Sequence, residues 1–351
     1  MNERDRCVDV ARGLGIALVV LGHNPLVLHG PTGEPFRVIY SFHMPLFFFL
    51  SGTFFNARRP WWESALGRAD ALLKPYAVTL LAFAFADLLL GGQEFWMHLL
   101  RMAYATGEAL QSGWVPLWFL PHLFVLSLVG WCALRALGRR TALVRWTWTA
   151  ALLVAGVASI DLAWRREVSI FGAQIALPGL PFSVDLLPVT LSFFLAGAWL
   201  RPQVEGFRPR PALLVLALAA FVACHALLDV TINLNTRKYP APWCTTLQAG
   251  AGIYLTLSLA HLLLRWPVLE RPLALLGRAS LFVLLFHGAL QEAVFHAFAG
   301  TDAVPRRVVE SGALLVALTG PLAFWWLAWR VPAMGRWWLP RPRKPQGVVV
   351  S

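Results

Sequence analysis

An arginine and a histidine stand eleven residues apart in an otherwise apolar stretch near the start of the chain, ARGLGIALVVLGH, Ala11 to His23. On an α-helix, eleven residues return to within roughly 20° of the starting face and rise about 16 Å. A helical stretch would therefore place Arg12 and His23 on one face, half a bilayer apart. Because a charged or titratable side chain is costly in lipid, this pair predicts a functional site. Asp9 could pair with Arg12 along the helix, and that local ion pair is as good an account of Asp9 as a catalytic one.

A second histidine, His43, lies in the next apolar stretch, IYSFHMPLFFFLSGTFF. The two stretches are joined by a short connection, so we expect His23 and His43 at a similar depth and able to meet. Pro45 is expected to kink the second helix one turn from His43. Ser51 and Gly52 form a small-residue patch that lets another helix, or a ligand, approach the backbone. A single intramembrane histidine can equally serve as a hydrogen-bond partner between helices, but the shared depth and face favour a functional pair.

Four further side chains are weaker candidates for binding a substrate. They are Trp118, Asp229, His287 and Glu292. Each can either line a cavity that opens outward or make a buried contact between helices, and the sequence leaves these alternatives open.

The segment 56–75 carries Arg58, Arg59, Arg68 and Lys74. Anchoring at the inner membrane surface accounts for this charge by itself. The segment also follows Ser51 and Gly52 directly, and cations at the inner mouth of a helical cavity are where a phosphate-rich cofactor would dock. We therefore predict phosphate contacts from Arg68 and Lys74, together with Arg12.

The composition indicates the class of protein that holds these residues. Of the 351 residues, 58% are hydrophobic and 14% are charged, and apolar runs of about 18–20 residues recur, which is typical of a multi-span α-helical membrane protein. The ten-residue alternating segments of a β-barrel are missing. The net charge of +12 does not indicate nucleic-acid binding, because the basic residues are scattered among short loops.

We predict an all-α integral membrane protein with a bundle of about ten transmembrane helices. The expected spans are 8–28, 37–55, 76–91, 116–135, 146–163, 182–200, 212–230, 245–264, 279–297 and 311–330. With the N-terminus inside, 22 of the 30 Lys and Arg residues fall on the inner side, which places both termini in the cytoplasm. The expected organisation is a single transmembrane domain over 1–335 and a disordered cytoplasmic tail over 336–351.

Several of these stretches, in this order, resemble the acyltransferase family 3 membrane proteins, and within that family the fucose 4-O-acetylase-like group. The matching stretches are RGLGIALVVLGH (Arg12–His23), FHMPLFFFLSG (Phe42–Gly52), KPY (Lys74–Tyr76), PLWFLPHLF (Pro116–Phe124) and LGRASLFVLLFH (Leu276–His287). The spacing of arginine, ten residues and histidine is the family's signature, and the resemblance covers nearly the whole chain. The basic stretch before Pro75 departs from the family, which often has several arginines close together there.

The resemblance implies transfer of an acyl group, usually acetyl from acetyl-CoA, to a hydroxyl of a carbohydrate or lipid-linked sugar. Arg12 and His23 match the family's essential pair, and Ser51 with Gly52 matches its small motif. The expected location is the bacterial inner membrane, with membrane lipid around the spans. No metal is expected. Many relatives carry a fused extracytoplasmic domain, which is not expected here, so we expect the spans and the short outer loops to select the acceptor.

These expectations lead to a mechanism with acyl-CoA bound from the inner side and its pantetheine arm directed towards His23. His23 acts as general base on the acceptor hydroxyl or takes the acetyl group transiently as an acyl-imidazole, and the sequence leaves both open. His43 would orient His23 or polarise the thioester carbonyl. The alternative is a transporter of a polysaccharide or lipid-linked sugar that performs no chemistry.

Overall fold

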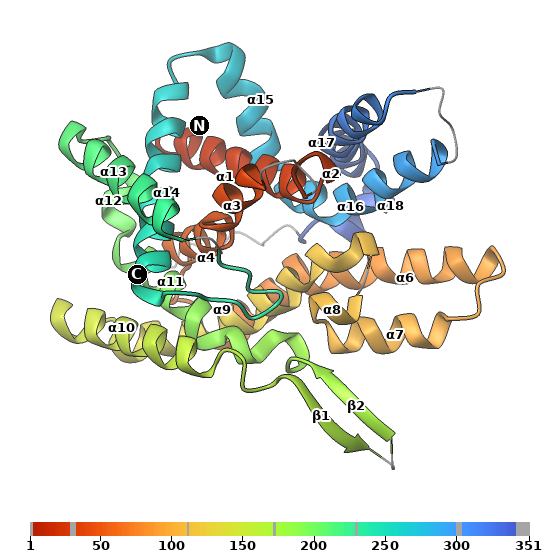
Figure 1. The fold of residues 1–351 in the computed structure, drawn as a ribbon, viewed down its shortest axis with the longest axis horizontal. Coiled ribbons are helices and arrows are strands. Elements are labelled where there is room, and N and C mark those ends of the chain that lie inside the picture. The colour runs from red at the N-terminus through yellow and green to blue at the C-terminus, as the bar shows by residue number, and fades with distance from the viewer. Residues whose placement is uncertain are drawn as a thin grey trace, which may run out of the picture.

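Helices make up most of the chain in the computed structural model, which describes residues 3–28, 33–110, 112–170, 173–228, 231–299 and 304–341 (Figure 1). The elements in chain order are α1 (Glu3–Gly22), α2 (Pro25–Leu28), α3 (Glu34–Tyr40), α4 (His43–Thr53), α5 (Trp61–Arg68), the π-helix η1 (Ala69–Leu73), α6 (Lys74–Leu89), α7 (Phe95–Tyr104), α8 (Gly107–Leu110), the 3₁₀-helix η2 (Ser112–Trp118), α9 (Phe119–Leu137), α10 (Ala142–Ser159), β1 (Trp164–Ile170), β2 (Ala173–Pro178), the 3₁₀-helix η3 (Pro181–Leu186), α11 (Leu187–Trp199), α12 (Arg201–Glu205), α13 (Pro211–Leu227), α14 (Pro242–Leu263), α15 (Pro267–Arg278), α16 (Ser280–Ala297), α17 (Arg306–Arg330) and α18 (Pro332–Trp338). Strands β1 and β2 pair antiparallel, with an irregularity in register between Trp164 and Glu167. This hairpin extends out from the helices and was not predicted from the sequence.

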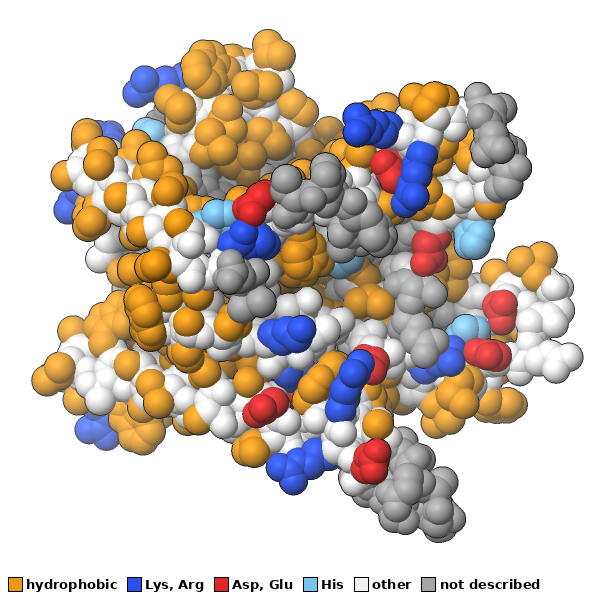
Figure 2. Space-filling view, viewed as in Figure 1, with side chains coloured by type: hydrophobic (Ala, Val, Ile, Leu, Met, Phe, Trp, Pro, Cys, Tyr) orange, Lys and Arg blue, Asp and Glu red, His pale blue; other side chains and the backbone are white. Residues whose placement is uncertain are grey.

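Within the described residues, seven helical segments are long and apolar enough to cross a membrane. They are Trp61–Leu89, Gly113–Leu137, Ala142–Ser159, Pro181–Trp199, Pro242–Leu263, Ser280–Ala297 and Arg306–Arg330, with Pro211–Leu227 as a shorter apolar helix. These eight segments coincide with the third to tenth predicted spans, and the all-α membrane bundle is confirmed. Apolar side chains cover much of the surface, as expected for helices in contact with lipid (Figure 2). The number ten and the side on which each terminus lies stay predictions.

The second predicted span is not one continuous helix. The chain breaks at Ser41 and Phe42, between α3 and α4, and Phe42 has φ −146°. The predicted kink at Pro45 was therefore wrong, because Pro45 lies in the first turn of α4, where a backbone N–H has no partner inside the helix to lose. The break places His43 at the first position of α4.

Paired glycines bring the site-forming helices into close contact. A Cβ on Gly13 of α1 would collide with the carbonyl oxygen of Leu273 of α15, and one on Gly277 of α15 with that of Asp9. The same reciprocal arrangement joins α4 and α11, where a Cβ on Gly52 would collide with the carbonyl oxygen of Phe194. Small residues at helix crossings allow this approach in membranes.

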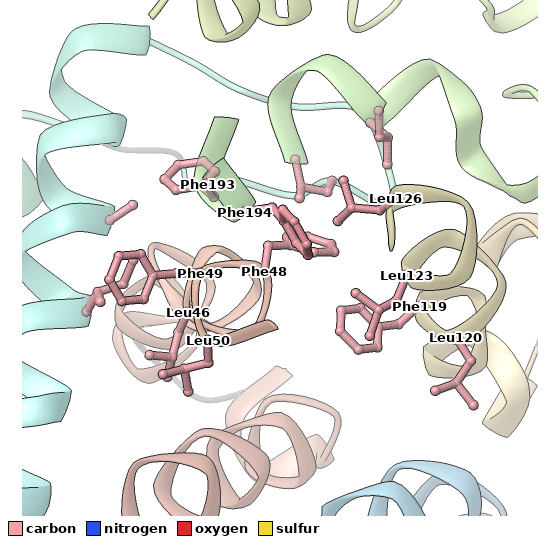
Figure 3. Packing of buried hydrophobic residues seen from close by; sticks show 14 of the residues in the cluster. Leu46, Phe48, Phe49, Leu50, Phe119, Leu120, Leu123, Leu126, Phe193 and Phe194 are labelled. Carbon is pink, nitrogen blue, oxygen red and sulfur yellow. The ribbon is translucent and has the colours of Figure 1, made fainter. Parts of the chain in front are cut away.

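The buried aromatic core surrounds the crossing of α4 and α11. Phe48 of α4 and Phe194 of α11 are both fully buried, and they lie beside Leu126 of α9 in Figure 3. The ring of Phe48 lies 5.3 Å from that of Phe119 at the start of α9. This core fixes α4, which carries His43, against α9 and α11.

The first part of the expected disordered tail is ordered. Residues 336–338 belong to α18, and Trp338 donates a hydrogen bond from Nε1 to Oγ1 of Thr79 (3.0 Å). The backbone of Arg341 donates to Oδ2 of Asp70 (2.6 Å). Hydrogen bonds to α6 and η1 therefore fix residues that composition alone indicated as tail. The remaining residues of that prediction, 342–351, lie outside the described part of the chain.

Candidate active site

One cavity of about 330 Å³ brings together most of the residues that the first two apolar stretches predict. Arg12, His23, His43 and Ser51 line it, and so does Trp118. Its walls come from α1, α3, α4, η1, η2, α9 and α16, together with the connection between α13 and α14. The predicted candidates thus meet in one place, although they come from segments far apart in the sequence.

Helix α1 presents a single stripe of side chains to this cavity. The lining residues on this side are Arg12, Ile16, Val19 and His23. Their spacing of four, three and four residues follows one helical face. The prediction that Arg12 and His23 share a face is therefore confirmed, and the two lie at opposite ends of the stripe.

The hydrogen bonds of the histidines fix where each ring carries its proton. Nδ1 of His23 lies 2.8 Å from the carbonyl oxygen of Val19, and Nδ1 of His43 lies 2.9 Å from that of Ile39. A carbonyl oxygen can only accept, so Nδ1 is the protonated nitrogen in both rings. In the neutral imidazole, Nε2 is then an unprotonated acceptor, which is the form required of a general base or a nucleophile.

Tyr40 joins the two histidines. Its ring centroid lies 4.6 Å from that of His43, in an edge contact, and 6.3 Å from that of His23. His23 and His43 were expected to lie at a similar depth and to be able to meet; both line the same cavity, and Tyr40 contacts each of them. Tyr40 was not predicted from the sequence, although its position three residues before His43 is a usable signal.

His287 lies behind His23 and outside the cavity lining. The two rings are 5.4 Å apart in an edge arrangement. His287 is fully buried, and its Nδ1 donates to the carbonyl oxygen of Val283 (2.9 Å). Its Nε2 has no hydrogen-bond partner among the residues that the structure describes. His287 therefore contacts the reactive histidine and does not face the cavity itself.

Of the three residues predicted to contact phosphate, Arg12 lines the cavity, while Arg68 and Lys74 lie outside its lining. The Arg12 guanidinium lies 5.4 Å from the centre of the Phe54 ring, and that of Arg68 lies 5.0 Å from the centre of the Phe55 ring. Lys74 lies outside the cavity lining and is engaged by Oδ1 of Asp70 (2.8 Å) and by the carbonyl oxygen of Leu339 (2.6 Å).

The remaining predicted residues lie outside the cavity lining or outside the described chain. Gly52 contacts the backbone of α11, so its small size serves helix packing there. Glu292 is half-buried on α16 beside Gly113. Asp229 lies outside the described residues. Within the described residues, no group of three or more His, Cys, Asp or Glu side chains could hold a metal ion.

A cavity with a cation at one end and a neutral histidine at the other suits transfer of a group from an anionic donor. Residues 5–330 match the family model of the acyltransferase 3 proteins, described as an acyltransferase domain. The chain belongs to acyltransferase family 3. Comparison with curated proteins and with solved structures gave no significant match. The family match supports acyl transfer over transport without chemistry, and the fucose 4-O-acetylase-like assignment stays a prediction.

An acyltransferase of family 3 needs polar groups in its cavity, and several polar lining residues were not predicted from the sequence. Besides Tyr40, the missed residues are Asn233, Asn235 and Ser280. The two asparagines alternate with Ile232 and Leu234 in the short connection before α14. This alternation is the one local signal, and it does not reveal that the connection reaches a cavity formed by α1 and α4.

Proposed function

We propose that this chain transfers an acetyl group from acetyl-CoA to a hydroxyl of a carbohydrate or lipid-linked sugar of the cell envelope. It acts in the bacterial plasma membrane, with the Arg12 end facing the cytosol. The observation that carries the proposal is that Arg12 and the unprotonated Nε2 of His23 lie at opposite ends of the stripe of side chains, Arg12 to His23, that lines the cavity. In acetyl-CoA the anionic phosphates and the reactive thioester also lie at opposite ends of a long arm, so the donor fits a cation at one end of the stripe and a base at the other.

The Arg12 end receives the phosphates of the donor. Arg12 and Arg68 lie against neighbouring aromatic rings, Phe54 and Phe55, which supports a role for both guanidinium groups at one mouth of the cavity. Arginine suits this task because its charge is permanent and its planar donors match phosphate oxygens. The pantetheine arm then follows the α1 stripe for the rise of about 16 Å that separates Arg12 from His23.

The reaction takes place at His23. Its Nε2 accepts the proton of the acceptor hydroxyl while the hydroxyl oxygen attacks the thioester carbonyl. The carbon–sulfur bond then breaks, the CoA thiolate leaves, and the thiolate receives the proton held on His23. A stepwise route uses the same nitrogen, which attacks the thioester first and passes the acetyl group on as an acyl-imidazole. In either route Tyr40, which contacts the rings of both histidines, and His43 keep the His23 imidazole in its orientation.

The test is acetyl transfer by the purified protein in lipid nanodiscs with radiolabelled acetyl-CoA. His23→Ala is expected to lower kcat by about 10²–10⁴-fold, the usual contribution of a positioned base. Arg12→Ala is expected to raise the KM for acetyl-CoA with a smaller effect on kcat, because it removes binding remote from the reacting atoms.

A matched control is His296→Ala, since His296 is exposed at the end of α16. This variant is expected to keep wild-type kinetics. Wild-type turnover in His23→Ala would contradict the proposal, and so would a wild-type protein that consumes no acetyl-CoA.

A further inference from the structure

Two of the four cysteines of the chain lie against each other where α13 and α14 meet. Cys224 is in the last turn of α13, and Cys244 is the third residue of α14. The two helices pack against each other, and the thiol of Cys224 has that of Cys244 as its side-chain hydrogen-bonding neighbour. Both side chains are buried, with exposed fractions of 3% and 0%. Two thiols held side by side in this way are placed to form a disulfide bond.

The other two cysteines lie elsewhere in the fold. The thiol of Cys7 in α1 donates to the carbonyl oxygen of Leu257 (3.9 Å), and Cys132 is exposed near the end of α9. In the predicted orientation, Cys7 and Cys132 lie towards the cytosol, where thiols stay reduced. Cys224 and Cys244 lie at the outer ends of their helices, towards the oxidising compartment. The two cysteines in contact are therefore the two on the side where disulfides form.

The cysteine pair flanks a segment that forms part of the cavity wall. Between α13 and α14, four consecutive residues, 232–235, line the cavity. The middle of this connection is held by Arg237, whose buried guanidinium donates from Nε and Nη2 to the two carboxylate oxygens of Asp185 (2.7 and 3.1 Å). The ends of the connection depend on the two helices that carry it.

Helix α13 is the more weakly held of these two helices. It lies at the edge of the molecule in Figure 1. Within α13, which the structure describes throughout, Cys224 is the one buried residue, whereas α14 has twelve. A covalent bond at Cys224 would therefore act at the position where α13 is in closest contact with the bundle.

We propose that Cys224 and Cys244 form a disulfide bond that joins the outer end of α13 to the start of α14. The oxidant is a disulfide-bearing thiol oxidant of the outer compartment. One cysteine thiolate attacks this disulfide and releases one of its sulfurs as a thiolate, and the second cysteine thiolate then attacks the mixed disulfide and releases the other. Two protein thiols are oxidised, one disulfide is reduced, and the two protons pass to the leaving thiolates.

The burial of both sulfurs sets when this exchange takes place. A bulky oxidant does not reach side chains that are enclosed between packed helices, so the bond forms as the chain folds, before α13 closes on α14. The proposal rests on the predicted orientation of the helices and is independent of the proposed reaction.

Lys238 allows the bond to be mapped in the full-length protein. It lies between the two cysteines, and Cys244 is the one cysteine of the sequence that follows it. Cells that express the protein are treated with N-ethylmaleimide at harvest to block free thiols, and the denatured protein is cut with a lysine-specific endoprotease. The wild-type fragments on either side of Lys238 are expected to migrate together on a non-reducing gel and to separate on reduction.

Variants identify the two sulfurs that hold the fragments together. Cys224→Ser and Cys244→Ser are each expected to give fragments that separate without a reducing agent. Cys132→Ser is the matched control and is expected to leave the fragments joined. The proposal is overturned if the wild-type fragments separate without reduction and carry N-ethylmaleimide on both Cys224 and Cys244. A linkage that persists in Cys224→Ser overturns it as well, because Cys244 would then have another partner.

Reduction of the wild-type protein gives a second measurement that needs no substitution. The bond would close a loop of about twenty residues, so treatment with a phosphine, with reduction confirmed on the same gel, is expected to lower the Tm in detergent by about 5 °C. An unchanged Tm would show that the bond does not hold α13 in place. Neither measurement uses acetyl transfer, so failure here leaves the proposed function standing, and a protein that forms the bond but consumes no acetyl-CoA contradicts the proposed function alone.

Discussion

Three histidines around the cavity share one local arrangement, in which Nδ1 bonds to the carbonyl oxygen four residues earlier. His23, His43 and His287 all show it, with distances of 2.8–2.9 Å. In each case the partner lies four residues earlier, so the proton position follows from local structure, although for His43 the bond spans the break between α3 and α4. The sequence therefore predicted the two reactive candidates, His23 and His43, from neighbouring stretches. It could not predict that Tyr40 contacts both, since that depends on the break between α3 and α4.

Tyr40 offers a test of how the ring pair is held. Its ring contacts both histidines and stacks on Phe36 at 3.9 Å. Tyr40→Phe keeps these ring contacts and is expected to keep kcat within about twofold. Tyr40→Ala removes them, and the misplaced imidazoles are expected to cost on the order of 10-fold or more in kcat. Acetyl transfer by both variants measures the difference, and equal losses would show that the hydroxyl rather than the ring is needed.

Glu34 at the start of α3 is expected to make the stability of the protein depend on pH in the acid range. A hydrogen bond from Nε2 of His225 to its carboxylate (2.6 Å) lowers the pKa of Glu34, and the nearby charge of Arg37 acts in the same direction. A lowered folded-state pKa stabilises the protein above the unfolded pKa of about 4.3, and this contribution is lost as the pH falls through the lowered value. Thermal unfolding between pH 7 and pH 3 should therefore show a smaller acid-induced fall in Tm for Glu34→Gln than for wild type. Parallel curves would contradict this.

At the scale of elements, close helix crossings were partly predictable. Gly52 was predicted to be a small residue that permits close approach, and both Gly52 and Gly13 allow backbone contact with a neighbouring helix. Their partners, α15 and α11, lie more than a hundred residues away in the chain. Periodicity and hydropathy describe each helix alone, so they predict eight of the apolar helices but not which helices cross.

The crossing of α1 and α15 should be sensitive to a single methyl group. Gly13→Ala would force the Cβ against the carbonyl oxygen of Leu273, and overpacking of this kind typically costs about 1–3 kcal/mol. The matched control is Gly250→Ala in α14, where nothing lies within 4 Å of the added carbon. This control is expected to be neutral or to stabilise by up to about 1 kcal/mol, since alanine favours helix. Unfolding midpoints in detergent compare the two, and equal stability would contradict the close crossing.

At the scale of the whole molecule, the cavity is a product of distant contacts. Its lining combines residues of α1, η1 and α4 with the connection before α14. The hydropathy of residues 232–235 marks them as a loop between spans and carries no information on what they face. The Arg237–Asp185 ion pair, which fixes their position, joins two segments that each look like ordinary loop or helix start. Such long-range pairing is the part of the site that the sequence alone could not predict.

The segment after α17 links the end of the chain to the Arg12 mouth. Trp338 contacts Phe324 of α17 (5.2 Å between ring centroids) and bonds to Thr79 of α6. Leu339 and Arg341 engage Lys74 and Asp70 beside η1, the element whose Leu72 lines the cavity. The segment 332–341 therefore acts as a strap that holds η1 and α6 in position next to the proposed donor site.

Truncation after Val331 should remove this strap and loosen the donor mouth. We expect a lower Tm and a raised KM for acetyl-CoA, because Lys74 loses its bond to the carbonyl oxygen of Leu339 and Asp70 loses its bond from the backbone of Arg341. The Lys74–Asp70 ion pair and the hydrogen bond of His23 to Val19 remain. Truncation after Arg341 retains every contact described here and is expected to match wild type in both measurements. The substitution Trp338→Ala should reproduce part of the loss, since it removes the half-buried ring that contacts Phe324 and Thr79 and leaves the backbone contacts at Leu339 and Arg341 in place. If the shorter chain unfolds at the wild-type temperature and binds acetyl-CoA with an unchanged KM, residues 332–341 do not support the donor site. A fall in Tm with an unchanged KM would limit the role of the strap to stability and leave the position of η1 to its contacts with α5 and α9.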